Sequence, residues 1–153
     1  MFLVKDNVTE RVEQIKSYIK IEPPIAIILA ALHFEWTVKR AIIALGETPN
    51  LDLQKEKTSG LEDYKGLWKK EISTPAKTPR LPEVVKQWKD LDKAFKTKNY
   101  LVHGMATSCT PTHASKIVST ILDATNDVII FCKENGYDVN SKPPIKKKIT
   151  SIL

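Results

Sequence analysis

The sequence predicts an all-α protein, and three observations lead to this fold class. Only five glycines occur in 153 residues. Several long segments place apolar residues three and four positions apart, which is the period of an amphipathic helix. The ends of these segments coincide with prolines, which suit a first helical turn and disfavour helix in the residue before them. We expect a single helical domain over residues 1–137, followed by a basic, flexible C-terminal tail over residues 138–153.

The first expected helix covers residues 4–20, because one stripe of this segment is apolar and the opposite side is charged. Pro23 and Pro24 end it. A second helix begins at Pro24 or Ile25 and ends at Gly46. Its first half is apolar nearly all round, which is typical of a central, buried helix. Two apolar faces require more than one neighbour, either helices of the same chain or helices of a second subunit.

The middle of the chain is predicted by the same criteria. A polar connection over residues 47–60 leads to a short helix over residues 61–72. The proline-containing residues 73–82 form a crossing loop. The next helix opens at Pro82, carries a lysine-rich polar face and keeps its apolar period to Phe95. It leads directly to residues 98–103, where Asn99 either ends the helix or opens the next turn.

The last helix is expected to start with Thr110 as its cap and Pro111 in its first turn. Its apolar residues keep the helical period until shortly before Gly136. The chain therefore offers four main amphipathic helices and one short helix.

The charge balance favours an acidic partner, with nucleic acid first and a membrane surface second. The formal net charge is +6 and the isoelectric point is about 9.2. Residues 138–153 hold four lysines and one aspartate, so this tail carries +3 of the +6. The helical domain is only mildly basic, and composition alone does not separate RNA from DNA.

Targeting and metal-binding signals are absent from the sequence. The N-terminus is charged too soon for a signal peptide, and the apolar run from Ile25 to Phe34 spans only ten residues, well short of a membrane span. We expect a cytoplasmic protein with no membrane partner. Cys109 and Cys132 belong to no CxxC or Cys/His cluster, so we predict neither a disulfide framework nor a metal site, and no cofactor.

The segment from Phe95 to Gly104 is the strongest candidate for chemistry. Lys98 and His103 are five residues apart, and Asn99 directly follows the lysine. On a helical backbone this spacing brings the two side chains within about 1.4 turns of each other. A cation beside an imidazole suits phosphate chemistry, because the cation neutralises phosphoryl oxygens while the imidazole transfers protons near neutral pH. The alternative is an exposed lysine beside a helix-end histidine with no function.

Two charged residues of the second helix are further candidates. Glu35 or Arg40 would project into the groove that holds His103 if this helix lines the site. The alternative is a solvated face, on which Glu35 and Lys39 form a helical ion pair worth a few tenths of a kcal/mol.

These residues resemble the HEPN superfamily, whose hallmark is an arginine, four to six residues and then a histidine, often with a polar residue after the arginine. Here the element reads Lys98-Asn99-Tyr100-Leu101-Val102-His103-Gly104, and its Leu-Val-His-Gly ending is similar to bacterial members. The resemblance extends to Phe34–Trp36 and to Trp88–Phe95, and so covers most of the chain. It implies a bundle of four main antiparallel helices plus a short helix.

The resemblance also implies a function and partners. Many HEPN proteins are metal-independent endoribonucleases, often toxins of toxin–antitoxin or phage-defence systems. They act as homodimers in which two motifs face one cleft, so RNA, a second copy and a cognate antitoxin are the implied partners. His103 would activate the ribose 2′-hydroxyl or protonate the leaving oxygen. Lys98 would hold the scissile phosphate, with Asn99 orienting.

Two departures from the family pattern bear on activity. Lys98 stands where the family has arginine, and lysine lacks the planar fork that binds a phosphate through two hydrogen bonds. Losing one such bond in a transition state removes a factor of about 100 to 1,000 in rate. Met105 stands where some family toxins carry a tyrosine that an antitoxin modifies. Two alternatives therefore stay open: a non-catalytic HEPN module that binds nucleotide, RNA or protein, and a helical bundle with a structural role and an accidental motif.

Overall fold

The computed structural model describes residues 7–56, 58–73, 79–105 and 108–141, with no β-strand in these ranges. The all-α prediction is confirmed. Seven helices lie within the described ranges: α1 (Val8–Tyr18), α2 (Pro23–Leu45), α3 (Asn50–Leu53), α4 (Leu61–Glu71), α5 (Leu81–Val84), α6 (Trp88–Val102) and α7 (Pro111–Glu134).

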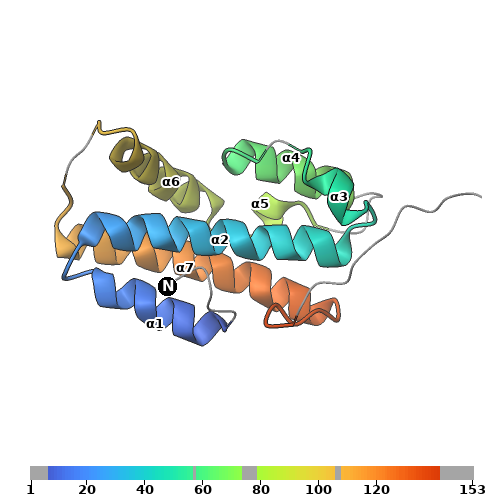
Figure 1. Cartoon of the computed structure of the whole chain (residues 1–153), viewed down its shortest axis with the longest axis horizontal. Helices are drawn as coiled ribbons and strands as arrows, with labels where there is room; N and C mark the ends of the chain where they lie inside the picture. Colours follow the sequence, from blue (N-terminus) through green and yellow to red (C-terminus); the bar gives the residue numbers. More distant parts are fainter. Residues whose placement is uncertain (1–6, 57, 74–78, 106–107, 142–153) are drawn as a thin grey trace, which may run out of the picture.

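Helices α2 and α7 form the centre of the fold and share its largest interface. Figure 1 shows α1 below this pair and α6 above it. Helices α2 and α7 run in the same direction, and α1 and α6 run in the opposite direction. Ten of the 23 residues of α2 are buried, in agreement with its largely apolar sequence. The neighbours that this helix requires are present in the same chain, since α2 contacts α1, α4, α6 and α7.

The predicted continuous helix from Pro82 is wrong, because the structure divides it into α5 and α6. Val85 is buried and has extended backbone angles, with φ −81° and ψ 107°. The next backbone N–H, that of Lys86, donates to the Asp127 carboxylate of α7 at 3.0 Å. An external acceptor thus replaces the helical carbonyl at this point. Periodicity did not reveal the break because Val84, Trp88 and Phe95 keep helical spacing across it.

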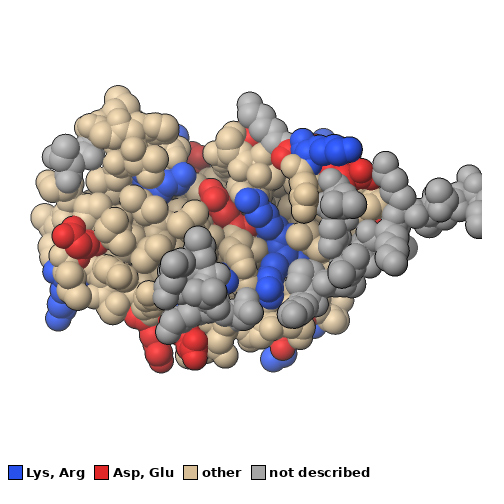
Figure 2. All heavy atoms as spheres, viewed as in Figure 1, with Lys and Arg blue, Asp and Glu red and all other residues tan. Residues whose placement is uncertain are grey.

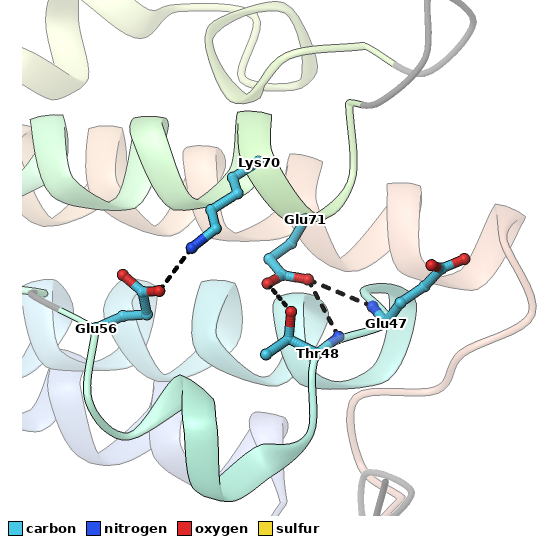
Figure 3. Close-up of polar contacts among 5 residues, drawn as sticks. All are labelled: Glu47, Thr48, Glu56, Lys70 and Glu71. Carbon is cyan, nitrogen blue, oxygen red and sulfur yellow. Dashed lines mark hydrogen bonds and ion pairs between the residues drawn. The ribbon is translucent and has the colours of Figure 1, made fainter. Parts of the chain in front are cut away.

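The connection between α2 and α4 was predicted only to be polar; it contains the short helix α3 and is tied to the end of α4. Figure 3 shows the Glu71 carboxylate accepting from the backbone N–H groups of Glu47 and Thr48 and from the Thr48 hydroxyl. In the same figure the Lys70 ammonium lies 2.7 Å from the Glu56 carboxylate. These contacts fix α4 against the C-terminal end of α2.

A side chain at Gly46, the residue that ends α2, would collide with this arrangement. A Cβ atom built there would lie 2.6 Å from the Ile42 carbonyl oxygen and 2.9 Å from the Glu71 carboxylate. The carbonyl belongs to the helix backbone and cannot move away at low cost. Close approach, and not the backbone angles, therefore requires glycine at this position.

The residues that follow α7 pack back onto the helices. Val139 is buried, and its carbonyl accepts from the Arg40 guanidinium at 2.7 Å. The Val8 backbone N–H, at the start of α1, donates to the Asn140 side chain at 3.0 Å. The packed part of the chain therefore continues past residue 137, where we placed the domain boundary, at least to Ser141. Residues 142–153, the lysine-rich part of the expected flexible tail, lie outside the described residues.

None of the described helices combines the length and the apolar character that a membrane crossing requires.

Candidate functional site

The Lys98–His103 element occupies the C-terminal end of α6, where the helix ends in a fixed geometry. The helix continues through Val102, and His103 is its C-terminal cap. Gly104 adopts a left-handed conformation with φ +72°. The Met105 N–H then donates to the Tyr100 carbonyl at 2.9 Å, and the Gly104 N–H donates to the Leu101 carbonyl. This is a Schellman motif, for which glycine is the favoured residue. Gly104 thereby fixes the backbone from which the His103 imidazole projects.

His103 presents an exposed imidazole that forms no hydrogen bond to any residue the structure describes. Lys98 is half-buried one and a half turns earlier, and its ammonium lies 5.3 Å from the centre of the Phe95 ring. Five residues of helix separate the two positions by about 7.5 Å along the axis. The imidazole is therefore accessible, whereas the lysine is held by its own helix.

Asn99 faces a different part of the surface from Lys98. It lines a groove of about 310 Å3 between α6 and the start of α4, whose lining includes the carboxylates of Glu62, Asp63 and Asp92. Lys96 lines the same groove and pairs with Asp92 at 3.1 Å, so the lining has three carboxylates against one cation. This net negative charge disfavours a phosphate, and the groove does not suit RNA. The structure thus gives Asn99 no common groove with Lys98, although the two residues are adjacent in sequence.

Glu35 and Lys98 are brought together by the packing of α2 against α6. Burial raises the pKa of the half-buried Glu35 carboxyl above its ordinary value, while the positive charges of Lys98 and Lys39 oppose this shift. Figure 2 shows side chains of both signs meeting at the middle of this face, where α2 runs below the space between α6 and α4 in the view of Figure 1. Glu35 therefore lies within electrostatic range of Lys98, whereas our hypothesis placed it in the groove that holds His103.

Lys39 and Tyr64 also belong to this cluster, and the sequence did not mark them as site residues. Lys39 forms no ion pair with Glu35 within 4.0 Å in the described structure; its ammonium lies 5.8 Å from the Tyr64 ring. Burial, with a further contribution from the Glu35 charge, raises the pKa of Tyr64 to about 12. The spacing of Glu35 and Lys39 was the available signal, and we used it only for an ion pair in one of our two alternatives.

Arg40 serves a different region of the molecule. Its guanidinium donates to the Val139 carbonyl at 2.7 Å and to the Ser141 carbonyl at 3.0 Å, and lies 4.2 Å from the Trp36 ring. The Arg11 guanidinium lies 3.6 Å from the same ring. The contacts of Arg40 are those of a structural residue, in contrast to the place we considered for it beside His103.

His33 lies on the same side of α2 as Arg40. It is buried, and it stacks on Trp36 with ring centres 6.1 Å apart. Neither ring nitrogen has a hydrogen-bond partner among the residues described. Burial, and then the charge of Arg11, lower the pKa of His33 to about 4. An uncharged, inaccessible imidazole is not available for reaction with a macromolecule.

The surface around His103 is apolar. Tyr100, Val102 and Met105 of the α6 end are exposed, and so are Ile25 and Leu32 of α2. In Figure 2 the region over the first half of α2 and the end of α6 carries few charged side chains. Exposed apolar side chains that lie close together in the chain, as Tyr100, Val102 and Met105 do, are typical of interaction surfaces.

In the part of the chain that the structure describes, no three His, Cys, Asp or Glu side chains come close enough to hold a metal ion. No protein-family model, curated protein or solved structure matches this chain.

Proposed function

We propose that this chain is a metal-independent endoribonuclease of the HEPN type, acting in a toxin–antitoxin or phage-defence system in the cytoplasm. The observation that carries the proposal is that one helix end holds an accessible imidazole at His103 and a half-buried cation at Lys98, about 7.5 Å apart along the helix axis. His103 transfers protons to and from the ribose 2′-hydroxyl and the leaving oxygen. Lys98 stabilises the charge that develops on the phosphate.

Glu35 supports the proposal as a positioning residue. Its carboxylate carries the charge opposite to that of Lys98 and Lys39, and both lysines interact with it electrostatically. In the described structure neither lysine forms an ion pair with Glu35 within 4.0 Å, so the carboxylate biases the positions of the two cations at longer range. Asn99 has no assigned part in this step, because its side chain lines the acidic groove on the α4 side.

A second copy of the chain completes the proposed site. Cleavage needs one group to accept a proton and another to donate one, and each subunit offers one exposed histidine in the motif. A twofold dimer places the same surface patch of both subunits in contact. The exposed apolar residues beside His103 are suited to such contact. An antitoxin would inhibit the enzyme by covering the same surface.

A non-catalytic module that binds RNA, nucleotide or protein through the same surface is the second candidate. Lys98 favours it, because lysine cannot form the bidentate contact that arginine makes with a phosphate. The negative charge of Glu35 also competes with a phosphate for the Lys98 ammonium. Both features weaken stabilisation of the transition state without preventing binding.

Incubation with RNA in the presence of EDTA separates the two candidates. We expect slow cleavage by the wild type, none by His103→Ala, and a rate increase of about 100-fold or more in Lys98→Arg, which restores the second hydrogen bond. Lys96→Arg is the matched control, because Lys96 is exposed on the same helix and forms an ion pair with Asp92 at 3.1 Å. Absence of cleavage by both the wild type and Lys98→Arg would reject the enzyme and leave the binding module.

A further inference from the structure

A groove between α6 and α7, separate from the surface around His103, carries positive charge. It has a volume of about 200 Å3 and is lined by Asp90, Lys93, Ala94, Thr97, His113, Lys116, Ile117 and Thr120. Lys93 and Lys116 stand on opposite walls, one on each helix, and both are exposed. The base of the groove is apolar and closed, since Ala94 and Ile117 are buried.

Lys116 connects this groove to a second hollow at the beginning of α7. That hollow has a volume of about 430 Å3 and is lined by Ile19, Lys20, Pro111, Thr112, Ser115 and Lys116. The two depressions share Lys116 and together form one polar track, which we call the α7 track. It contains three lysines and one carboxylate, Asp90, among its described lining residues.

The lysines of the α7 track are not neutralised by neighbouring acids. Lys20, Lys93 and Lys116 form no ion pair within 4.0 Å in the described structure, although Asp90 is three residues before Lys93 on the same helix. By contrast, Lys55, Lys65, Lys70 and Lys96 each contact a carboxylate. A track that carries three lysines against one carboxylate attracts a polyanion.

Hydroxyl groups on the track add to this complementarity. Thr97 and Thr120 donate to carbonyls of their own helices, at 3.4 and 3.0 Å. Thr112 and Ser115 make no such bond in the described part of the chain, so their hydroxyl groups are available to phosphate oxygens. Lysine and hydroxyl contacts of this kind bind the sugar–phosphate backbone without reading its sequence.

The position of the track relates it to the proposed catalytic motif. Thr97 precedes His103 by six residues on α6, which corresponds to about 9 Å along the helix axis. Figure 1 shows that the end of α6 and the beginning of α7 lie at the same end of the molecule. A strand that leaves His103 therefore reaches the track within a short length of backbone.

We propose that the α7 track binds the backbone of single-stranded RNA beyond the scissile phosphate. This proposal rests on the proposed nuclease function. A membrane surface fits the track less well, because membrane-binding faces insert large exposed apolar side chains. The exposed large hydrophobic residues of the described structure, among them Tyr100, Val102 and Met105, do not line it. The track therefore extends the RNA contact of each subunit and sets a minimum length for tight binding.

Binding of a 20-nucleotide single-stranded RNA to the His103→Ala protein tests the track without cleavage. Each lysine–phosphate contact contributes about 0.7 to the slope of log K against log salt, and hence roughly a factor of 5 in affinity at 0.1 M salt. The double variant Lys93→Gln/Lys116→Gln should therefore bind about 25-fold more weakly, with a slope smaller by about 1.4. Lys69→Gln/Lys133→Gln removes two exposed lysines outside the track and should leave both quantities unchanged.

Cleavage of short and long substrates separates failure of the track from failure of the nuclease proposal. With His103 present, Lys93→Gln/Lys116→Gln should raise KM for the 20-nucleotide RNA and leave cleavage of a dinucleotide unchanged, since a dinucleotide does not reach the track.

Three results would overturn the proposal that the α7 track binds RNA. The first is an unchanged affinity and salt slope in Lys93→Gln/Lys116→Gln, and the second is absence of RNA binding by His103→Ala. The third is that Lys93→Gln/Lys116→Gln reduces binding to phosphatidylserine vesicles and leaves RNA binding unaffected. In each case cleavage by the protein that retains His103 decides separately whether the nuclease function stands.

Discussion

Two sides of helix α2 each carry a cation and use it in opposite ways. His33, Trp36 and Arg40 form one side, and Leu32, Glu35 and Lys39 form the other, displaced by a single residue. One residue of helix is a rotation of about 100°, which is sufficient to change every neighbour. The first side faces α1 and the residues after α7, and the second faces α6 and α4.

On the first side the polar groups are enclosed by packing. Arg40 is bound to two backbone carbonyls, the Trp36 ring has a guanidinium from Arg11 and another from Arg40 nearby, and His33 is buried and neutral. On the second side, Glu35 and Lys39 stay partly or fully in contact with water and interact with Lys98 and Tyr64 at longer range. Both sides hold a cation, so positive charge alone does not decide its role here; accessibility and existing partners do.

The largest difference between the two sides should appear when their cations are removed. Arg40→Ala loses two charged hydrogen bonds and a contact with Trp36, so we expect the free energy of unfolding to fall by about 2–4 kcal/mol. Lys39→Ala removes an exposed cation of the same helix and should change it by less than about 0.5 kcal/mol. Urea denaturation of both variants measures these values. Equal effects would contradict the distinction between the two sides.

His33 should make stability dependent on pH at the acid side of neutrality. Its pKa falls from 6.5 when unfolded to about 4 when folded. The unfolded chain thus binds the proton more readily, and stability is lost as the pH falls from 6.5 toward 4, by up to about 3 kcal/mol. His33→Phe keeps a ring beside Trp36 and should lose less stability over this range. Parallel stability curves for the two proteins between pH 7 and pH 4 would refute this assignment.

Glu35 should also make the free energy of unfolding depend on pH, by a smaller amount and in the opposite direction to His33. Because burial raises its folded pKa above 4.5, the native state holds the proton more tightly than the unfolded chain does. Stability contributed by the protonated form is lost as the pH rises above 4.5 through the folded pKa. Glu35→Gln should remove this decline. The decline in stability should be smaller than the loss caused by His33, because Glu35 is only half-buried. A decline that persists in the glutamine variant would assign it to another group.

Much of the fold follows from local sequence patterns. The apolar period and the prolines predicted α2 to within two residues at its start, and the Thr110–Pro111 pair marked the beginning of α7. The break between α5 and α6 was not predictable in this way, because it depends on Asp127, a residue 41 positions from Lys86. Gly46 was expected only as a helix end, and its contact with Glu71 is likewise visible only in three dimensions.

The candidate site was predictable to a lesser degree. The motif located Lys98 and His103 at one helix end, since five residues of helix are a local property. The sequence could not decide that Glu35 meets Lys98 while Arg40 turns to Val139, because both outcomes keep the same amphipathic pattern. Asn99 is adjacent to Lys98 in sequence but lines another groove, since successive helical side chains point about 100° apart.

The two histidines give the most direct test of the proposed nuclease. Single-turnover cleavage of RNA in EDTA at pH 7 should slow by about 100-fold or more in His103→Ala, since that is the usual contribution of a general acid or base. His33→Phe, which changes a buried imidazole on the other side of α2, should retain the wild-type rate. Equal cleavage by His103→Ala and the wild type, or loss of cleavage only in a correctly folded His33→Phe protein, would contradict the account.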